Sequence, residues 1–467
     1  MEMLRRVSKR SQVTSHPENP IQLLTDKLPA TYQPIVKPLI RQQSELFGVP
    51  ESAFEGRGAE TFARSPYGSD SDTLDSEIYT HGSVLIVISV HESVRILNRR
   101  NDEGDIVAFE DKTSIVRVTY AIPSVNPVDL SEFERFVGEV WEGIELQEVI
   151  TSPRRIREIA AGKPNTTNAP TPEELGAAEA LSDKAVRMLA IAIKSSSGLL
   201  LGDAPKQIPP RERGRVDEIV QILIAQKLVE TEVVIVCAKT SAQVNRVPSV
   251  DVLADLDKYG MRCACGRPLS AEKNEKALSI TDFGRSLLDG SAWLSFLVLQ
   301  YLLDFGVPSR NIRMEQEYSG EEIDCLAEIY GRLVLFELKD KEFNLGNAYS
   351  FGAKVGIFRP DVPVIVTTER VGADARDHFV RSANVGKTSR RFSEESSTGD
   401  SMIFIEGLEN LRSGLEGVVT EIASAALAPP LRTAFAFASA NPTALLSAWS
   451  GIDWSSKSVR PRKRQGS

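Results

Sequence analysis

The feature that most constrains this chain is a pair of β-prone runs joined by a short turn. The runs extend from 323 to 329 and from 333 to 338, and the residues between them are Tyr330, Gly331 and Arg332. Glycine supplies the backbone freedom that a tight connection between two strands needs. This stretch therefore predicts a β-hairpin, and with it a sheet in this part of the molecule.

Three charged side chains of this hairpin are expected to meet. Glu337 and Lys339 are two residues apart, so they project from one face of the strand while Leu338 points away. Asp324 lies near the start of the first strand, opposite the end of the second. Carboxylates are hard oxygen ligands suited to Mg²⁺, and a lysine can orient a water or offset charge in a transition state. The alternative is an exposed charged ribbon in which Glu337 and Lys339 form a salt bridge.

The order of Asp324, Glu337 and Lys339 resembles the motif of the PD-(D/E)XK nuclease superfamily, the fold of many restriction enzymes and junction resolvases. The resemblance implies that Asp324 and Glu337 are metal ligands, that the main-chain carbonyl of Leu338 is a further ligand, and that Lys339 is catalytic. It covers about residues 290–424, under a third of the chain. The implied fold is an αβββαβ core with an added βα unit.

The neighbouring sequence fits this core. The expected elements are an apolar helix over 293–303, the hairpin, a helix over 345–358, a strand over 362–367, a helix over 373–381, a strand over 402–405 and a helix over 408–424.

One position departs from the pattern of the family. Many relatives carry a glutamate on the first helix after a Trp-Leu pair, where this chain has Ser295. Either Asp324 and Glu337 suffice, or another acid completes the set; the candidates are Glu315, Glu317, Glu321 and Glu322. Four residues on or near the following helix are expected to complete the pocket or to grip the substrate backbone: Glu342, Asn347, Tyr349 and Lys354.

The resemblance implies an enzyme, a phosphodiester hydrolase that uses Mg²⁺ or Mn²⁺ and acts as an endonuclease on nucleic acid, with DNA favoured. It also suggests defence against foreign DNA, with a homo-oligomer or partner proteins of a defence system. The alternative is a nucleic-acid-binding regulatory or scaffolding subunit with an inactive nuclease fold.

Length and composition limit the remaining possibilities. A chain of 467 residues predicts about three domains, here an α/β protein of the α+β multidomain kind. The net charge of −9 excludes a basic coat for nucleic acid, so any contact must come from local patches. We expect no membrane association and a cytoplasmic protein, because no apolar run has the length of a membrane span and the first residues lack a secretion signal. Four cysteines in so long a chain do not suggest a disulfide framework.

Composition along the chain suggests seven segments. They are a helical segment over 1–73, an α+β domain over 74–150, a linker over 151–174, a winged-helix-like domain over 175–250, a degenerate zinc-ribbon-like connector over 251–289, the nuclease domain over 290–424 and a helical, basic tail over 425–467. In the first two, helices are expected over 21–28, 32–47 and 130–141, and strands over 84–90, 93–98, 106–109 and 114–122.

The winged-helix-like segment offers a contact surface for nucleic acid. Helices are expected over 182–194 and 209–228, followed by a β-run over 229–236. Arg211, Arg213 and Arg215 stand in the first turns of the second helix, where they would face a phosphate backbone. A spacer or a dimer surface explains this segment equally well.

Two further basic stretches are candidates for nucleic-acid contact. Arg390 and Arg391 belong to a basic loop, and the stretch 457–464 carries five cations in eight residues. A basic tail would add salt-sensitive affinity for polyanions. Its alternative role is to keep the protein soluble.

The cysteines outline two knuckles of a zinc ribbon. Cys237 forms one, and Cys263 with Cys265 forms the other. Thr240 stands where the second cysteine of the first knuckle would be, so a fourth ligand is missing unless Glu272 or Glu275 supplies it. We prefer a degenerate ribbon that keeps its shape without metal, and we expect Cys325 to belong to the core.

Overall fold

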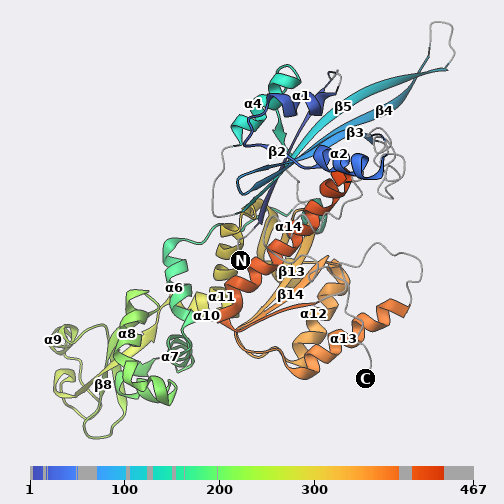
Figure 1. Ribbon diagram of the computed structural model, residues 1–467. Coiled ribbons are helices and arrows are strands. Elements are labelled where there is room, and N and C mark those ends of the chain that lie inside the picture. The colour runs from blue at the N-terminus through green and yellow to red at the C-terminus, as the bar shows by residue number, and fades with distance from the viewer. Residues whose placement is uncertain are drawn as a thin grey trace.

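The computed structural model describes residues 4–13, 17, 19–48, 50, 71–100, 106–123, 130–149, 154–161, 163–196, 198–388 and 402–435. Within these residues the protein is of mixed α+β type with three sheets (Figure 1). This confirms the expectation of an α+β multidomain protein. The basic loop with Arg390 and Arg391 and the basic tail lie outside the described residues.

The first sheet has six strands in the order β2-β3-β4-β5-β1-β6, each antiparallel to its neighbours. Its elements are β1 Leu4–Val13, α1 Pro20–Lys27, β2 Gln33–Pro34, α2 Val36–Phe47, β3 Ser71–His81, β4 Val84–Arg100, β5 Ile106–Pro123, α4 Ser131–Val140 and β6 Gln147–Glu148. Large buried side chains, among them Tyr79, Tyr120 and Phe133, form the core between this sheet and its helices.

Two expectations for this region were wrong. The first residues are strand β1 rather than helix, because β5 pairs with them along their whole length, from Leu4 with Pro123 to Val13 with Ser114. The runs expected over 84–90 and 93–98 are one strand, β4, and those expected over 106–109 and 114–122 are one strand, β5; the two pair from Leu85 to Arg100 of β4. In both cases a long partner strand, rather than the local pattern, decides the conformation.

The middle of the chain forms helices and a second sheet in the order β7-β10-β8-β9. The elements are α5 Arg154–Ala160, α6 Pro172–Ser182, α7 Lys184–Ser195, β7 Leu199–Leu200, the 3₁₀ turns Leu201–Lys206 and Pro210–Arg215, α8 Val216–Ala225, β8 Val229–Val236, β9 Gln243–Val247, α9 Asp251–Lys258 and β10 Lys273–Ile280. The composition of the chain predicts a domain boundary at residue 250. Because β10 pairs with β8, the second sheet contains strands from both sides of that boundary.

Local chemistry shifts two helix starts in this region. The carboxylate of Asp183 accepts hydrogen bonds from the N–H groups of Ala185 at 2.8 Å and Val186 at 3.4 Å, so a new helix begins at Lys184 and not at 182. The helix expected over 209–228 is divided, because Pro210–Arg215 forms a 3₁₀ turn before α8.

The third sheet has five strands in the order β11-β12-β13-β14-β15. Its elements are α10 Asp282–Leu288, α11 Ala292–Asp304, β11 Ile312–Tyr318, β12 Glu321–Ile329, β13 Arg332–Lys339, α12 Leu345–Phe358, β14 Val362–Thr367, α13 Ala373–Thr388, β15 Ile403–Glu406 and α14 Leu411–Phe435. The pairs β11–β12 and β12–β13 are antiparallel, and β13–β14 and β14–β15 are parallel.

Helices cover both faces of this sheet. On one face, α11 and α14 pack on Cys325, Phe336 and Val364; on the other, α12 and α13 pack on Leu335 and Ile365. α13 and α14 extend beyond their expected ends at 381 and 424, and α14 reaches the first sheet, where it contacts β1, β3 and β4 (Figure 1).

The segment expected to be a linker lies against the third sheet. Ile156 of α5 is fully buried in the same cluster as Leu326 and Leu335. Beyond α5, the ammonium of Lys163 donates to the carbonyl of Glu317 at 2.7 Å, and the Thr167 hydroxyl accepts a hydrogen bond from the N–H of Met314 at 3.0 Å. Its proline-rich composition prevents regular structure over 163–170 but not attachment to the edge of β11.

One helical stretch, Asp282–Asp304, is long and apolar enough to cross a membrane by composition, and 44% of that window is buried inside the protein. The stretch is broken at Gly290, whose φ is 60°. Its second half, α11, buries Trp293, Leu294 and Val298 in the core shared with the third sheet. These contacts are those of a core helix in a globular domain. Cytoplasmic location stays a prediction.

Candidate functional site

The turn of the hairpin places the charged residues opposite each other. Tyr330 and Gly331 both have positive φ, 48° and 79°, as a two-residue type I′ turn requires. The register pairs Cys325 with Phe336, so Asp324 faces Glu337 one step further along. Opposed residues of an antiparallel pair point to the same face.

The hairpin residues converge on Lys339. Its ammonium lies 2.8 Å from Oε1 of Glu337 and 3.5 Å from Oδ2 of Asp324. The N–H of Leu338 donates to the same Oδ2 of Asp324 at 2.7 Å, which orients that carboxylate. The alternative of an exposed ribbon does not hold, because the side chains of Glu337, Asp324 and Lys339 are only 3%, 14% and 25% exposed.

A second lysine completes this acid–lysine cluster, which we define as Asp324, Glu337, Lys339 and Lys354. The Lys354 ammonium, from α12, lies 2.8 Å from Oε2 of Glu337 and 4.0 Å from Oδ1 of Asp324. Its side chain is 8% exposed. Lys354 is thus a buried partner of the acids and completes the pocket, one of the two roles expected for it; its contact with nucleic acid stays a prediction.

Burial and charge set the protonation of the cluster. Burial, and then the charge of Glu337, raise the pKa of Asp324 above its ordinary value, and Lys339 and the Leu338 N–H oppose this. Burial lowers the pKa of Lys339, but Asp324 and Glu337 outweigh it and leave the pKa above its ordinary value. Lys339 therefore stays a cation at neutral pH.

Glu315 is the acid that contacts Ser295, the position where many members of the family carry a glutamate. The hydroxyl of Ser295, on α11, donates a hydrogen bond to Oε1 of Glu315. Glu315 lies across from Asp324 in the register of β11 and β12, between the paired positions Met314–Cys325 and Gln316–Ile323. Its φ of 46° interrupts the ladder there, a strained conformation of the kind often found at functional sites.

The electrostatics of Glu315 connect it to the cluster. Desolvation by neighbouring groups raises its pKa to about 7; the Ser295 hydrogen bond opposes this, and the charge of Asp324 adds to it. The residue as a whole is still exposed to solvent, so a ligand or ion can reach it. Among the four acids considered for this place, the structure brings Glu315 to Ser295 and Asp324.

Asp340, the residue after Lys339, ties the cluster to the helical segment. Its carboxylate lies 3.1 Å from Nε of Arg187 on α7, and it accepts hydrogen bonds from the Trp293 indole at 3.2 Å and the Thr368 hydroxyl at 3.2 Å. Sequence reasoning missed this connection, since nothing local to Arg187 indicates a partner so far along the chain.

The other residues expected around the pocket have different partners. Glu342 forms an exposed ion pair with Arg370 at 3.3 Å, and Asn347 forms a capping box with Asn344 at the start of α12. Tyr349 is 59% exposed and meets the ring of His378 edge-on at 4.7 Å. None of these contacts joins the acid–lysine cluster.

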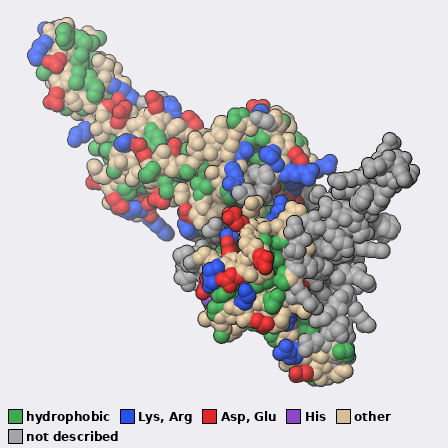
Figure 2. Space-filling model, turned by 90° about the horizontal axis from the view of Figure 1, so that it is seen from above, with side chains coloured by type: hydrophobic (Ala, Val, Ile, Leu, Met, Phe, Trp, Pro, Cys, Tyr) green, Lys and Arg blue, Asp and Glu red, His purple; other side chains and the backbone are tan. Residues whose placement is uncertain are grey.

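The arginines expected to contact nucleic acid divide into two groups. Arg211 and Arg213 are exposed. Arg215 forms ion pairs with Asp183 at 3.1 Å, Glu212 at 2.8 Å and Glu218 at 3.2 Å, which offset its charge. On the face seen in Figure 2, basic and acidic side chains are interspersed over the described surface.

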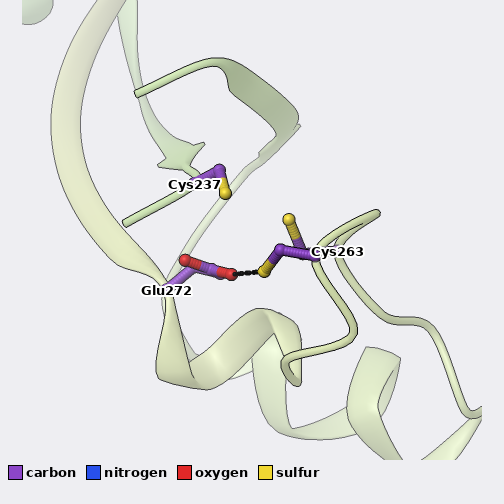
Figure 3. A group of neighbouring side chains, drawn as sticks. Cys237, Cys263 and Glu272 are labelled. Carbon is purple, nitrogen blue, oxygen red and sulfur yellow. Dashed lines mark hydrogen bonds between the residues drawn. The ribbon is translucent and has the colours of Figure 1, made fainter. Parts of the chain in front are cut away.

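The cysteines do come together. The sulfurs of Cys237, Cys263 and Cys265 and a carboxylate oxygen of Glu272 all lie within 4.8 Å of one another, so this group, here the cysteine cluster, can hold a metal ion (Figure 3). Hydrogen bonds from the hydroxyl and N–H of Thr240 and the N–H of Lys239 lower the pKa of Cys237 to about 7. Thr240 therefore acts on Cys237 as a hydrogen-bond donor, although it stands where a zinc ribbon would have a second cysteine. Cys325 is fully buried in the third sheet, as expected.

Comparisons with known proteins give little beyond this geometry. No family model matches the chain, and no curated protein is similar to it. Among solved structures, the crystal structure of protein VC1899 from Vibrio cholerae is similar with 13% sequence identity and a TM-score of 0.29. The match covers 56% of this chain and 58% of that chain. A similarity of that degree carries no argument about fold or function.

Proposed function

We propose that this chain is a metal-dependent nuclease of the PD-(D/E)XK type, which hydrolyses phosphodiester bonds in nucleic acid, DNA being the favoured substrate. The observation that carries the proposal is the convergence of Asp324, Glu337 and Lys339 on adjacent strands, with the Lys339 ammonium within 3.5 Å of both carboxylates. The element order from α11 to β15 is the helix, three strands, helix, strand, helix and strand that such a core would have.

The donor set fits a hard divalent cation. Carboxylate oxygens from Asp324 and Glu337 face one space. Glu315, on the neighbouring strand, lies close enough for the charge of Asp324 to act on it, and its own carboxylate accepts a hydrogen bond from Ser295. The main-chain carbonyl of Leu338 stays the further ligand that the resemblance implies. A bound Mg²⁺ or Mn²⁺ would supply Lewis-acid chemistry, activating water and neutralising phosphate charge.

The residues of the chain have separate roles in this proposal. Asp324 and Glu337 hold the cation, and the Leu338 N–H fixes the orientation of Asp324. Lys339, cationic at neutral pH and the most exposed of the cluster, positions the attacking water and offsets the charge that develops on the phosphate. Lys354 keeps the second oxygen of Glu337 in place. Exposed Arg211 and Arg213 remain candidates for backbone contacts. A role in defence against foreign DNA rests on analogy with restriction enzymes alone.

A digestion panel tests the proposal. Single- and double-stranded DNA and RNA are incubated with the purified chain and Mg²⁺ or Mn²⁺, with and without chelator. We expect cleavage that needs the divalent ion and that falls by about a hundredfold or more in Asp324→Asn and in Lys339→Met, because each change removes charge where the transition state needs it. Glu342→Gln, an exposed acid nearby, is the control that keeps activity. Cleavage that survives in Asp324→Asn would place the chemistry elsewhere.

A second candidate is a nucleic-acid-binding subunit with an inactive nuclease fold. One observation favours it: the two carboxylates of the cluster already have two ammonium partners, so their charges are balanced without a metal. Such a protein would bind nucleic acid without digesting it, and Mg²⁺ would not change its thermal stability. Binding would then depend on Arg211 and Arg213 and tolerate Glu337→Gln.

A further inference from the structure

The cysteine cluster lies in the second sheet, away from the acid–lysine cluster, and it is assembled from three separate segments. Cys237 follows β8, Cys263 and Cys265 lie between α9 and β10, and Glu272 immediately precedes β10. Figure 3 shows Cys237, Cys263 and Glu272 directed toward a common centre. For tetrahedral zinc with bonds of about 2.3 Å to sulfur, the ligand atoms would lie about 3.8 Å apart. The observed limit of 4.8 Å needs only a small contraction.

Both cysteine segments have a backbone suited to holding a metal. The Ser241 N–H donates to the Cys237 carbonyl at 2.8 Å, which folds the chain back on itself in a turn directly after Cys237. In the second segment the Gly266 N–H donates to the Cys263 carbonyl at 2.8 Å, and Gly266 has a φ of 90°, which side chains rarely allow. Each turn is therefore closed by its own backbone before any ion binds.

Glu272 is the acid that the structure assigns as the fourth ligand, rather than Glu275. The Glu272 residue is 5% exposed; one of its carboxylate oxygens accepts from the Ala238 N–H at 2.6 Å and the other from the Cys265 thiol at 2.9 Å. No ion pair among the described residues includes Glu272. Glu275 is instead paired with Lys273 at 2.5 Å. A buried carboxylate beside three thiols is well suited to a metal cation, because burying a charge is costly unless an opposite charge balances it.

The surrounding apolar core is small. Its buried non-cysteine members are Val233, Ile235, Val247, Leu253 and Leu269. So few apolar side chains bury little area, and small lobes of this kind are commonly held by a metal or a disulfide. The cysteines are free in this structure, and two of them belong to the core itself.

We propose that Cys237, Cys263, Cys265 and Glu272 bind one structural Zn²⁺ that holds the second sheet to the segment between α9 and β10. Three thiolates and one carboxylate close a tetrahedral site and leave no position for substrate. On binding, the three thiols release their protons to solvent, and the hydrogen bond from Cys265 to Glu272 is replaced by bonds from both groups to the metal. Thiolates select zinc over Mg²⁺ or Mn²⁺ because they are soft ligands.

Metal analysis of the full chain tests this proposal. The protein is purified without chelator, its zinc content is measured by mass spectrometry, and apo-protein is titrated with Zn²⁺ and with Co²⁺. We expect one zinc per chain and a Co²⁺ spectrum with thiolate charge-transfer bands and intense visible bands of tetrahedral coordination. Cys263→Ser with Cys265→Ser should abolish both. Glu272→Gln, which keeps the shape and an acceptor oxygen, should weaken zinc binding about tenfold or more.

Three controls separate this site from other sources of metal. Glu275→Gln and Cys325→Ala should keep full zinc content, and Asp324→Asn should keep the thiolate bands, which shows that the ion is not at the acid–lysine cluster. Wild-type protein that takes up no zinc and gives no thiolate bands would overturn the proposal. So would a disulfide among the three cysteines in freshly purified protein, or zinc that stays stoichiometric in the double cysteine variant.

Discussion

The acid–lysine cluster and the cysteine cluster differ in how the charge of their buried groups is balanced. In the first, two carboxylates are matched by two ammonium groups within 4.0 Å, so the group is balanced by its own residues. In the second, three thiols and a carboxylate lie together, and no ion pair among the described residues includes that carboxylate. The first can stand without a metal, whereas in the second a bound cation would supply the positive charge that the thiolates and the carboxylate need.

The two clusters also differ in their origin in the chain. A single hairpin supplies most of the acid–lysine cluster, and the strand register fixes the distance between Asp324 and Glu337. The cysteine cluster needs three segments to close around β8 and β10. A contiguous motif can therefore be identified from sequence, but a ligand set from separate segments is complete only in the folded protein.

The largest expected effect is that of a chelator on amide hydrogen exchange. If zinc holds the second sheet, its removal should speed exchange in β8, β9 and β10 by about ten-thousandfold or more, because the free energy of metal binding is coupled to local folding there. The exchange rates of amides in β12 and β13 should not change, because Lys339 and Lys354 still balance the carboxylates there when metal is removed. Exchange is measured by mass spectrometry on the full chain with and without chelator. If the chelator changed the exchange rates of the two sheets equally, the proposed contrast between the clusters would be wrong.

Next in size is the loss of Lys354. Lys354→Met leaves Glu337, whose side chain is 3% exposed, with one partner fewer in a buried site. We expect the free energy of unfolding to fall by about 3–5 kcal/mol, the usual cost of breaking a buried ion pair. Urea denaturation measures it, with Lys341→Met, an exposed lysine, as the matched control. Adding Glu337→Gln should recover part of the loss; a purely additive double variant would show that the pair is not coupled.

A smaller effect is expected from the junction between α7 and β13. Arg187→Ala removes the guanidinium from Asp340, which keeps its hydrogen bonds from Trp293 and Thr368. Unfolding should become easier by about 2 kcal/mol because a buried carboxylate loses its cation but not its donors. Arg211→Ala, a change at an exposed arginine, serves as the control and should have little effect. Equal losses in the two variants would argue against a special link to the cluster.

The smallest effect concerns pH. Glu315 has its pKa raised to about 7 in the folded protein, above the ordinary value of 4.5, so between those values the folded state holds more protons than the unfolded state. Stability should therefore decline as pH rises from about 5 to about 7 in the absence of divalent ions. Glu315→Gln should flatten this slope in denaturation curves, and Glu317→Gln, an exposed neighbour, should not. A slope that is the same in both variants would mean that another group titrates.

Much of the third sheet was predictable because its signals are local. Alternating apolar runs around Gly331 gave the hairpin, and the expected order of the following helices and strands matches the observed one. The choice of Glu315 over Glu317, Glu321 and Glu322 was not predictable, since it depends on a φ of 46° and on the approach of Ser295 from α11. Likewise β1 became a strand only because β5 was there to pair with it.

By itself the sequence determined which side chains are two apart on one strand, and so which charges of the hairpin share a face. Only the tertiary structure decided the partners from elsewhere: Lys354 from α12, Arg187 from α7 and Glu272 beside the three cysteines. The physical reason is the sequence separation of the residues in contact. Backbone geometry fixes neighbours within a strand or turn, but contacts between distant segments follow from the packing of whole helices and sheets, which no short pattern encodes.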